Sequence, residues 1–145
     1  MNLLDEPHVA TRPVVMARVL LADDDPTSRL TLQTVLRAGG YEVDAAASAA
    51  EAVGLMDEQE YELVLSDLHM ESPESGLKVL AHARMMDYKP ATAIVSVHQR
   101  GESNLERPGV LIEPEDVPEL LDKVADLISE RAMRRLRQQL RSTGS

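Results

Sequence analysis

Short apolar runs alternate along the chain with longer segments in which apolar residues recur every three or four positions. The apolar runs lie at residues 17–22, 41–46, 61–66, 92–97 and 109–112. Leu32, Val35 and Leu36 show the helical spacing that separates the first two runs. Runs of strand length that alternate with amphipathic segments are typical of parallel β-α-β units. The pattern therefore predicts an α/β fold, with a doubly wound five-stranded parallel sheet covered by helices on both faces.

Local signals mark the ends of the first two predicted helices. Pro26 suits the first turn of a helix, and the pair Gly39 and Gly40 is expected to end it. Ser48 and Glu51 form a capping-box pattern, in which each side chain accepts a hydrogen bond from a free backbone N–H of the first turn. We therefore expect a second helix that starts after Ser48.

The third and fourth helices are predicted with different lengths. Leu77, Leu80 and Ala81 indicate a third helix that reaches about Tyr88. The segment between the fourth and fifth strands contains almost no apolar residue except Leu105. The fourth helix is therefore expected to be reduced to a turn or two.

The last helix is predicted to overrun the sheet. It starts near Pro118 and carries one apolar face made of Val117, Leu120, Leu121, Val124, Leu127 and Ile128. An apolar stripe continues through Ala132, Met133, Leu136 and Leu140, among five arginines. We therefore divide the chain into an N-terminal extension at 1–16, one domain at 17–129 and a basic helical tail at 130–145.

Composition excludes several classes of function. The chain has no Cys, which excludes disulfides, thiolate metal sites and cysteine nucleophiles. It has no Trp or Phe and a formal charge of −10, so we expect no nucleic-acid binding. The first 15 residues never reach the apolar length of a signal peptide or a membrane span. We expect a cytoplasmic protein that does not contact a membrane.

Acidic and hydroxyl side chains follow the predicted strands. Asp23 and Asp24 come directly after the first strand, and Asp67 ends the third. Ser96 closes the fourth strand, and Glu113 follows the fifth. The carboxyl ends of parallel strands meet at one edge of a sheet, where ligands bind. A cluster of oxygen ligands without Cys or paired His suits Mg²⁺. An acidic run alone would equally fit a solvated turn, but its place after a strand favours a metal site.

The same segments resemble the receiver domain of two-component response regulators, over about residues 17–128. The matching segments are "VLLADDDP", "YELVLSDLHM", "IVS" and "GVLIEPEDVPELLDKV". The resemblance implies a flavodoxin-like receiver fold. It also implies a signalling module rather than an enzyme.

The resemblance assigns roles to individual residues. Asp67 matches the phosphoacceptor, which takes a phosphoryl group from a histidine kinase or a phosphotransfer protein. Asp23, Asp24, Asp67 and the backbone carbonyl of His69 match the Mg²⁺ ligands. Ser96 matches the switch hydroxyl that hydrogen-bonds the acyl phosphate.

The sequence departs from the family pattern near the site. Glu113 stands where receivers carry a Lys that pairs with the phosphoryl oxygens, and Glu71 replaces a Pro. At about 4 Å and an effective dielectric constant of about 20, one contact between unit charges is worth about 4 kcal/mol. Reversing the sign at position 113 is therefore expected to impair phosphoryl transfer.

Two other functions remain open. The chain is alternatively a pseudo-receiver that acts as a protein interaction module without phosphorylation, with a homodimer or partner-protein contact through residues 130–141. The segment "VLLADDDPTS" also loosely resembles the first motif of haloacid-dehalogenase-like phosphatases. In that family Asp23 would be the nucleophile, Asp25 the general acid and Thr27 the motif's hydroxyl, which leaves Asp67 unexplained.

Overall fold

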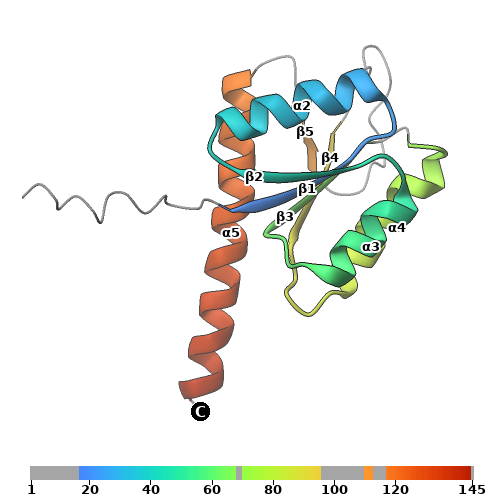
Figure 1. Cartoon of the computed structure of the whole chain (residues 1–145). Helices are drawn as coiled ribbons and strands as arrows, with labels where there is room; N and C mark the ends of the chain where they lie inside the picture. Colours follow the sequence, from blue (N-terminus) through green and yellow to red (C-terminus); the bar gives the residue numbers. More distant parts are fainter. Residues whose placement is uncertain (1–16, 68–69, 96–109, 113–116, 145) are drawn as a thin grey trace, which may run out of the picture.

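The computed structural model describes residues 17–67, 70–95, 110–112 and 117–144. The elements in these ranges are β1 (Arg18–Ala22), α2 (Pro26–Ala38), β2 (Glu42–Ala46), α3 (Ala49–Glu58), β3 (Leu63–Asp67), α4 (Pro73–Met85), β4 (Ala91–Val95), β5 (Val110–Ile112) and α5 (Val117–Gly144). The strands form one parallel sheet in the order β2-β1-β3-β4-β5 (Figure 1). The predicted α/β fold with a parallel sheet is confirmed. The reduced fourth helix was predicted for residues that lie outside the described ranges.

The sheet is buried on both faces. Along β1, Val19 and Leu21 belong to one apolar cluster, whereas Leu20 and Ala22 belong to another. Successive side chains of a strand point to opposite faces, so each cluster lies on its own side of the sheet. This explains why β1 reads as a continuous apolar run rather than an alternating one.

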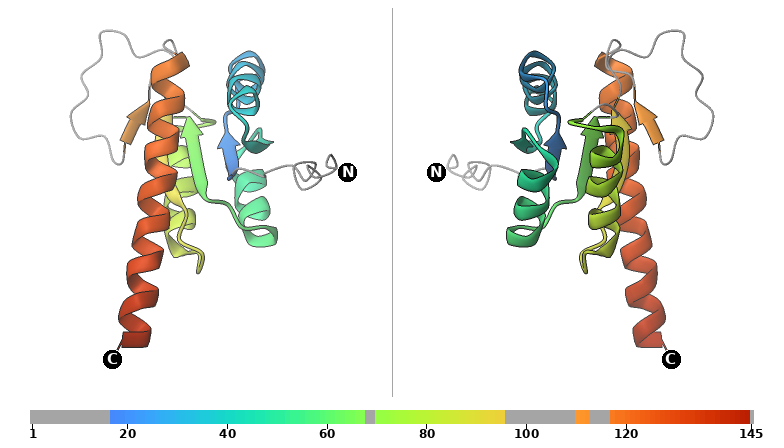
Figure 2. Two further views of the ribbon diagram at one scale, coloured as in Figure 1. Left: turned by 90° about the vertical axis from the view of Figure 1, so that its left-hand side faces the viewer. Right: turned by 90° about the vertical axis from the view of Figure 1, so that its right-hand side faces the viewer.

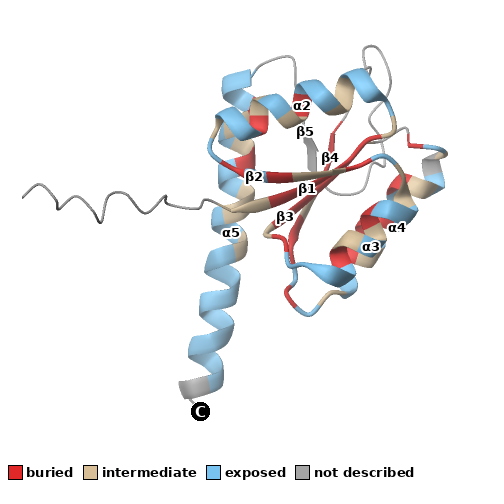
Figure 3. Cartoon of the chain, in the orientation of Figure 1, coloured by how far each residue is buried: buried red, intermediate tan, exposed pale blue. Residues whose placement is uncertain are grey.

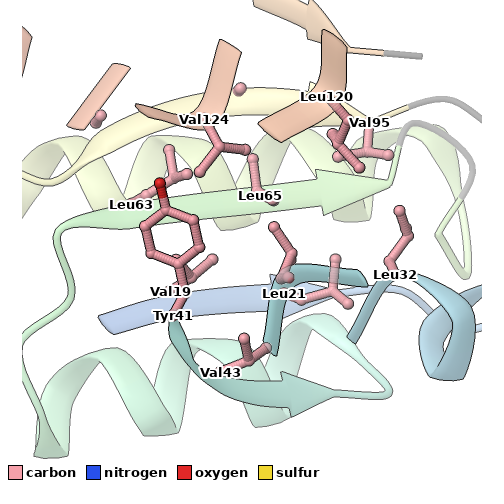
Figure 4. Close-up of a cluster of buried hydrophobic side chains, with 13 residues drawn as sticks. Val19, Leu21, Leu32, Tyr41, Val43, Leu63, Leu65, Val95, Leu120 and Val124 are labelled. Atoms are coloured by element: carbon pink, nitrogen blue, oxygen red, sulfur yellow. The ribbon is translucent and has the colours of Figure 1, made fainter. Parts of the chain in front are cut away.

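Among the described helices, two cover each face. The cluster on the first face includes Leu32 of α2 together with Leu120 and Val124 of α5 (Figure 4). Leu36 of α2 belongs to the same cluster. The cluster on the second face includes residues of α3 and α4. Figure 1 shows the same layers, with α2 and α5 on one side of the strands and α3 and α4 on the other.

The caps of α2 and α3 largely follow the sequence signals. α2 ends at Ala38 and is capped by Gly39, and Gly40 has the positive φ of 100° that glycine adopts without strain. The Ser48 side chain accepts a hydrogen bond from the Glu51 N–H at 3.1 Å, as predicted. The Glu51 carboxylate accepts from the N–H of Ala47 at 2.8 Å, one residue before the expected partner.

The third predicted helix, α4, is present but ends earlier than expected. It begins after the cap Ser72 and ends at Met85, three residues before Tyr88. Leu77 is 46% exposed. The face that packs on the sheet is formed by Gly76, Val79, Leu80 and Ala83.

The last helix, α5, continues as one element through the predicted boundary at 129/130. Its 28 residues span about 42 Å, whereas a five-residue strand spans about 17 Å. The second half therefore extends beyond the amino ends of the strands (Figure 2). There the large apolar side chains of Met133, Leu136 and Leu140 are exposed, and the helix surface is open to solvent (Figure 3). Among the described helices, none combines the length and the apolarity needed to cross a bilayer.

Candidate functional site

The acidic residues that follow β1 and end β3 lie side by side. β1 and β3 are neighbours in the sheet, and Ala22 pairs with Ser66 at their carboxyl ends. Asp23 and Asp24 follow Ala22, and Asp67 follows Ser66. The strand order reverses at β1 and β3, which is where open α/β sheets form their ligand crevice.

Three carboxylates converge at this edge. Asp23, Asp24 and Asp67 each bring an oxygen atom to within 4.8 Å of the other two. Asp23 is buried at 1% exposure, and the other two are half-buried. Three carboxylates this close repel one another unless a cation or protons neutralise them. The donor set is all oxygen, which fits Mg²⁺.

Asp23 is fixed in place by hydrogen bonds from four directions. Its carboxylate accepts from the Ser28 hydroxyl at 2.6 Å and from the Asp25 N–H at 3.0 Å. Its N–H donates to the carbonyl of Ala46 at 3.0 Å. Its carbonyl accepts from the Arg29 guanidinium at 2.9 Å. The position of this buried carboxylate is therefore set before any ligand binds.

Asp25, the third of the three consecutive aspartates, has a structural role. Asp25 is the N-cap of α2, and its carboxylate accepts from the Ser28 N–H at 2.8 Å. It is not a member of the carboxylate cluster. This arrangement argues against the phosphatase resemblance, because the cluster includes Asp67, which that resemblance left unexplained, and Asp25 serves as a cap.

The electrostatic environment disfavours a charged Asp24. Burial raises the pKa of Asp24, and the negative charge of Asp23 raises it further. The carboxylates of Glu71 and Asp25 act in the same direction, whereas a backbone hydrogen bond opposes them. A bound cation would reverse this effect, because it favours the charged carboxylate.

The contacts that Glu71 and Ser28 make in this region were not predicted. Both carboxylate oxygens of Glu71 lie 3.3 Å from the N–H of Ala49, so this side chain interacts with the amino end of α3. The spacing from Asp25 to Ser28 is that of a side-chain helix cap, so the hydrogen bond from the Ser28 N–H to Asp25 could have been predicted. No comparable signal links Glu71 to Ala49, because they are 22 residues apart.

Three of the predicted site residues lie outside the described part of the chain. These residues are His69, Ser96 and Glu113. The structure therefore brings together Asp23, Asp24 and Asp67 and leaves the other three assignments as predictions.

Comparison with curated proteins identifies relatives in signalling. The sensory/regulatory protein RpfC of Xanthomonas campestris pv. campestris is 32% identical over 119 residues, which cover 76% of this chain and 16% of RpfC. The alginate biosynthesis transcriptional regulatory protein AlgB of Pseudomonas aeruginosa is 35% identical over 81 residues, covering 56% of this chain and 18% of AlgB. The chain thus spans less than a fifth of the length of either relative.

Solved structures share the fold over most of the chain. A response regulator receiver protein from Sinorhizobium medicae matches with a TM-score of 0.67 and 27% identity, covering 79% of this chain and 96% of that one. The response regulator TrrA from Thermotoga maritima, solved in complex with Mg(2+)-BeF, matches with a TM-score of 0.65 and 29% identity. That match covers 77% of this chain and 99% of TrrA.

A family description matches more than half of the chain. Residues 19–107 match the response regulator receiver domain. This range includes β1, β3 and all three clustered carboxylates. Fold, site and sequence agree, and the chain belongs to the family of response regulator receiver domains.

Proposed function

We propose that the chain is a phosphoryl-accepting receiver of two-component signalling, with Asp67 as the phosphoacceptor. The observation that carries this proposal is the convergence of Asp23, Asp24 and Asp67, whose oxygens lie within 4.8 Å of one another. The domain would extend over 17–129, with 130–145 as a basic helical tail. Its donor would be a histidine kinase or a phosphotransfer protein in the cytoplasm.

The proposed reaction transfers a phosphoryl group between two side chains. A carboxylate oxygen of Asp67 attacks the phosphorus of a phosphohistidine as the phosphorus–nitrogen bond breaks. The donor imidazole leaves and takes up a proton, and Asp67 becomes an acyl phosphate. Such a transfer depends mainly on positioning and on neutralising charge. The fixed position of Asp23 supplies part of that positioning.

A divalent cation fits the cluster and would belong to this function. Asp23, Asp24 and Asp67 would hold Mg²⁺, with the backbone carbonyl of His69 added by resemblance. When bound, Mg²⁺ neutralises the carboxylates and the incoming phosphoryl oxygens. The TrrA structure, named as a complex with Mg(2+)-BeF, supports this choice of cation.

Glu113 is the main reason to expect a slow reaction. It would place a negative charge where the family's Lys pairs with the phosphoryl group, while Ser96 would supply the switch hydroxyl. A loss of about 1.4 kcal/mol in transition-state stabilisation slows transfer tenfold. We therefore expect Glu113→Lys to accelerate phosphorylation by at least about tenfold.

Mass spectrometry of the intact chain tests the proposal. The chain is incubated with Mg²⁺ and a small acyl phosphate donor, which removes the need for a cognate kinase. The expected result is the mass gain of one phosphoryl group in the wild type, faster gain in Glu113→Lys and no gain in Asp67→Asn. Equal gain in Asp67→Asn would contradict the assignment of the phosphoacceptor.

A second function is favoured by the exposed stripe on α5. Met133, Leu136 and Leu140 are spaced by three and four residues, as in the seam of a coiled coil. A parallel second copy would place Ala132 of one helix near Arg137 of the other, a pairing without like-charge repulsion. The pseudo-receiver alternative would act through this contact, with no phosphorylation of Asp67.

The oligomeric state in solution tests whether the exposed stripe on α5 forms this contact. Sedimentation of the wild type and Leu136→Asp should show a dimer that the substitution dissociates. Leu77→Asp is a matched control, because Leu77 is also exposed but lies on α4. A monomer at every concentration, or equal effects of both substitutions, would contradict the contact.

A further inference from the structure

A basic cavity lies at the opposite end of the sheet from the carboxylate cluster. It has a volume of about 450 Å³, within the range of small-molecule sites. Its walls come from the end of α4, the turn between α4 and β4, the start of β4 and the middle of α5. The lining residues are Arg84, Lys89, Pro90, Ala91, Thr92, Leu127, Glu130, Arg131, Arg134, Arg135 and Gln138.

Five basic side chains and one acidic side chain line this cavity. In the described part of the chain, none of the five basic groups has a carboxylate oxygen within 4.0 Å. Arg18, by comparison, pairs with Glu42 at 3.0 Å on another part of the surface. The cavity therefore holds an excess of positive charge, and no ion pair within the described residues neutralises it.

Backbone carbonyls hold two of the arginines in place. Arg131 donates to the carbonyls of Lys89 at 3.0 Å and Tyr88 at 2.7 Å. Arg135 donates to the same Tyr88 carbonyl at 2.8 Å. A guanidinium has five N–H donors, so both groups keep donors for a ligand. Groups that are ordered before binding lose less entropy when a ligand arrives.

The arginines also repel one another. Burial lowers the pKa of Arg131, and the positive charges of Arg135 and Arg134 lower it further. Glu62 and Glu60 oppose this effect. An anion bound among the arginines would relieve the repulsion and strengthen each hydrogen bond to it.

We propose that this cavity binds a small molecule with a chain of phosphate groups, contacted by Arg84, Arg131 and Arg134. Arginine forks bind phosphate oxygens in pairs, and several cations in one cavity favour a ligand with several negative charges. Pro90, Ala91 and Leu127 provide an apolar wall beside the charges. The ligand is therefore either a free polyphosphate or a nucleoside polyphosphate that places its nucleoside on that wall.

The proposal is independent of phosphorylation at Asp67. Asp67 lies at the carboxyl end of β3, whereas Thr92 lies near the amino end of β4. It is also independent of the exposed stripe. Arg131 and Arg135 contact the domain, and Leu136 and Leu140 lie toward the opposite side of α5 at 3.6 residues per turn.

Calorimetric titration of the full chain with inorganic tripolyphosphate and with ATP tests the proposal. A chelator removes divalent cations, so that the carboxylate cluster does not contribute. Arg134→Glu removes one proposed contact, and no hydrogen bond of the Arg134 side chain holds the described fold together. Arg137→Glu is the matched control: it makes the same change of charge on the same helix, outside the cavity.

The expected result is binding to the wild type that Arg134→Glu weakens by about tenfold or more. Arg137→Glu should change the affinity by less than about twofold at physiological salt, where exposed charges are largely screened. If tripolyphosphate and ATP bind with equal affinity, the cavity recognises the phosphates alone. If ATP binds more tightly, the apolar wall also contacts the nucleoside. No binding at millimolar concentration, or equal losses in both variants, would overturn the proposal.

Discussion

At the carboxyl end of the sheet, three carboxylates gather around a point where a cation fits, whereas at the amino end several arginines surround a cavity. The two clusters differ in what holds them. Asp24 has a raised pKa because it is half-buried beside Asp23, and in the function that we propose this cost would serve cation binding. Arg131 and Arg135 hydrogen-bond to backbone carbonyls, so their charges also attach α5 to the domain. A cluster of charges can therefore weaken a fold when the groups mainly repel one another, or strengthen it when they hydrogen-bond to backbone carbonyls.

The largest expected effect is at Asp67. Asp67→Asn should reduce phosphorylation by more than about a hundredfold, because the nucleophile is removed. Tripolyphosphate binding at the amino end should be unchanged. Intact-mass measurement and calorimetry on the same variant check both statements. Loss of both activities would show that the two ends are not independent.

A matched pair of substitutions separates the metal ligand from the helix cap. Asp23→Asn should weaken Mg²⁺ binding by about 10- to 100-fold, since a carboxylate of the cluster is lost. Asp25→Asn makes the same change of charge, but Asn caps a helix as well as Asp does. It should therefore have a much smaller effect. Magnesium titrations followed by amide chemical shifts measure both, and equal losses would contradict the distinction.

Removing a charge at the amino end should destabilise the protein. Arg131→Met loses hydrogen bonds to the carbonyls of Tyr88 and Lys89, which should lower the free energy of unfolding by about 1–2 kcal/mol. Arg137→Met, on the exposed part of α5, should change it by less than about 0.5 kcal/mol. Urea unfolding measures both variants. If Arg131→Met left the free energy of unfolding unchanged, these contacts would not hold α5 on the domain.

Removing a charge at the carboxyl end should do the opposite. Without Mg²⁺, Asp24→Asn should raise the free energy of unfolding by about 0.5–1 kcal/mol at neutral pH. A raised pKa of an acid costs stability above that pKa, and the cost disappears below the ordinary value. The gain should therefore shrink as the pH falls through the raised pKa. Urea unfolding at several pH values checks this, and a gain that grows toward low pH would contradict it.

The fold could be predicted because its signals are local. The apolar run of β1 and the glycines after α2 each specify structure within a few residues. The pairing of Asp23 and Asp24 with Asp67 was also predictable, because the carboxyl ends of neighbouring parallel strands meet.

The remaining features depend on contacts between distant parts of the chain. Arg131 and Lys89 are 42 residues apart, so no local pattern indicates that they share a cavity. Leu77, Leu80 and Ala81 indicated the helix α4, but not that it would bury Gly76 and Ala83 and leave Leu77 exposed. Tertiary packing decided both cases.

Titration with Mg²⁺ and then beryllofluoride, followed by amide chemical shifts, tests the assignment of Asp67 most directly. Wild type and Glu113→Lys are compared under the same conditions. We expect that Mg²⁺ shifts the amides of Asp23 and Asp24, and that beryllofluoride then shifts the amide of Asp67 in both proteins. A beryllofluoride response only in Glu113→Lys, or in neither protein, would contradict a phosphoryl-accepting receiver.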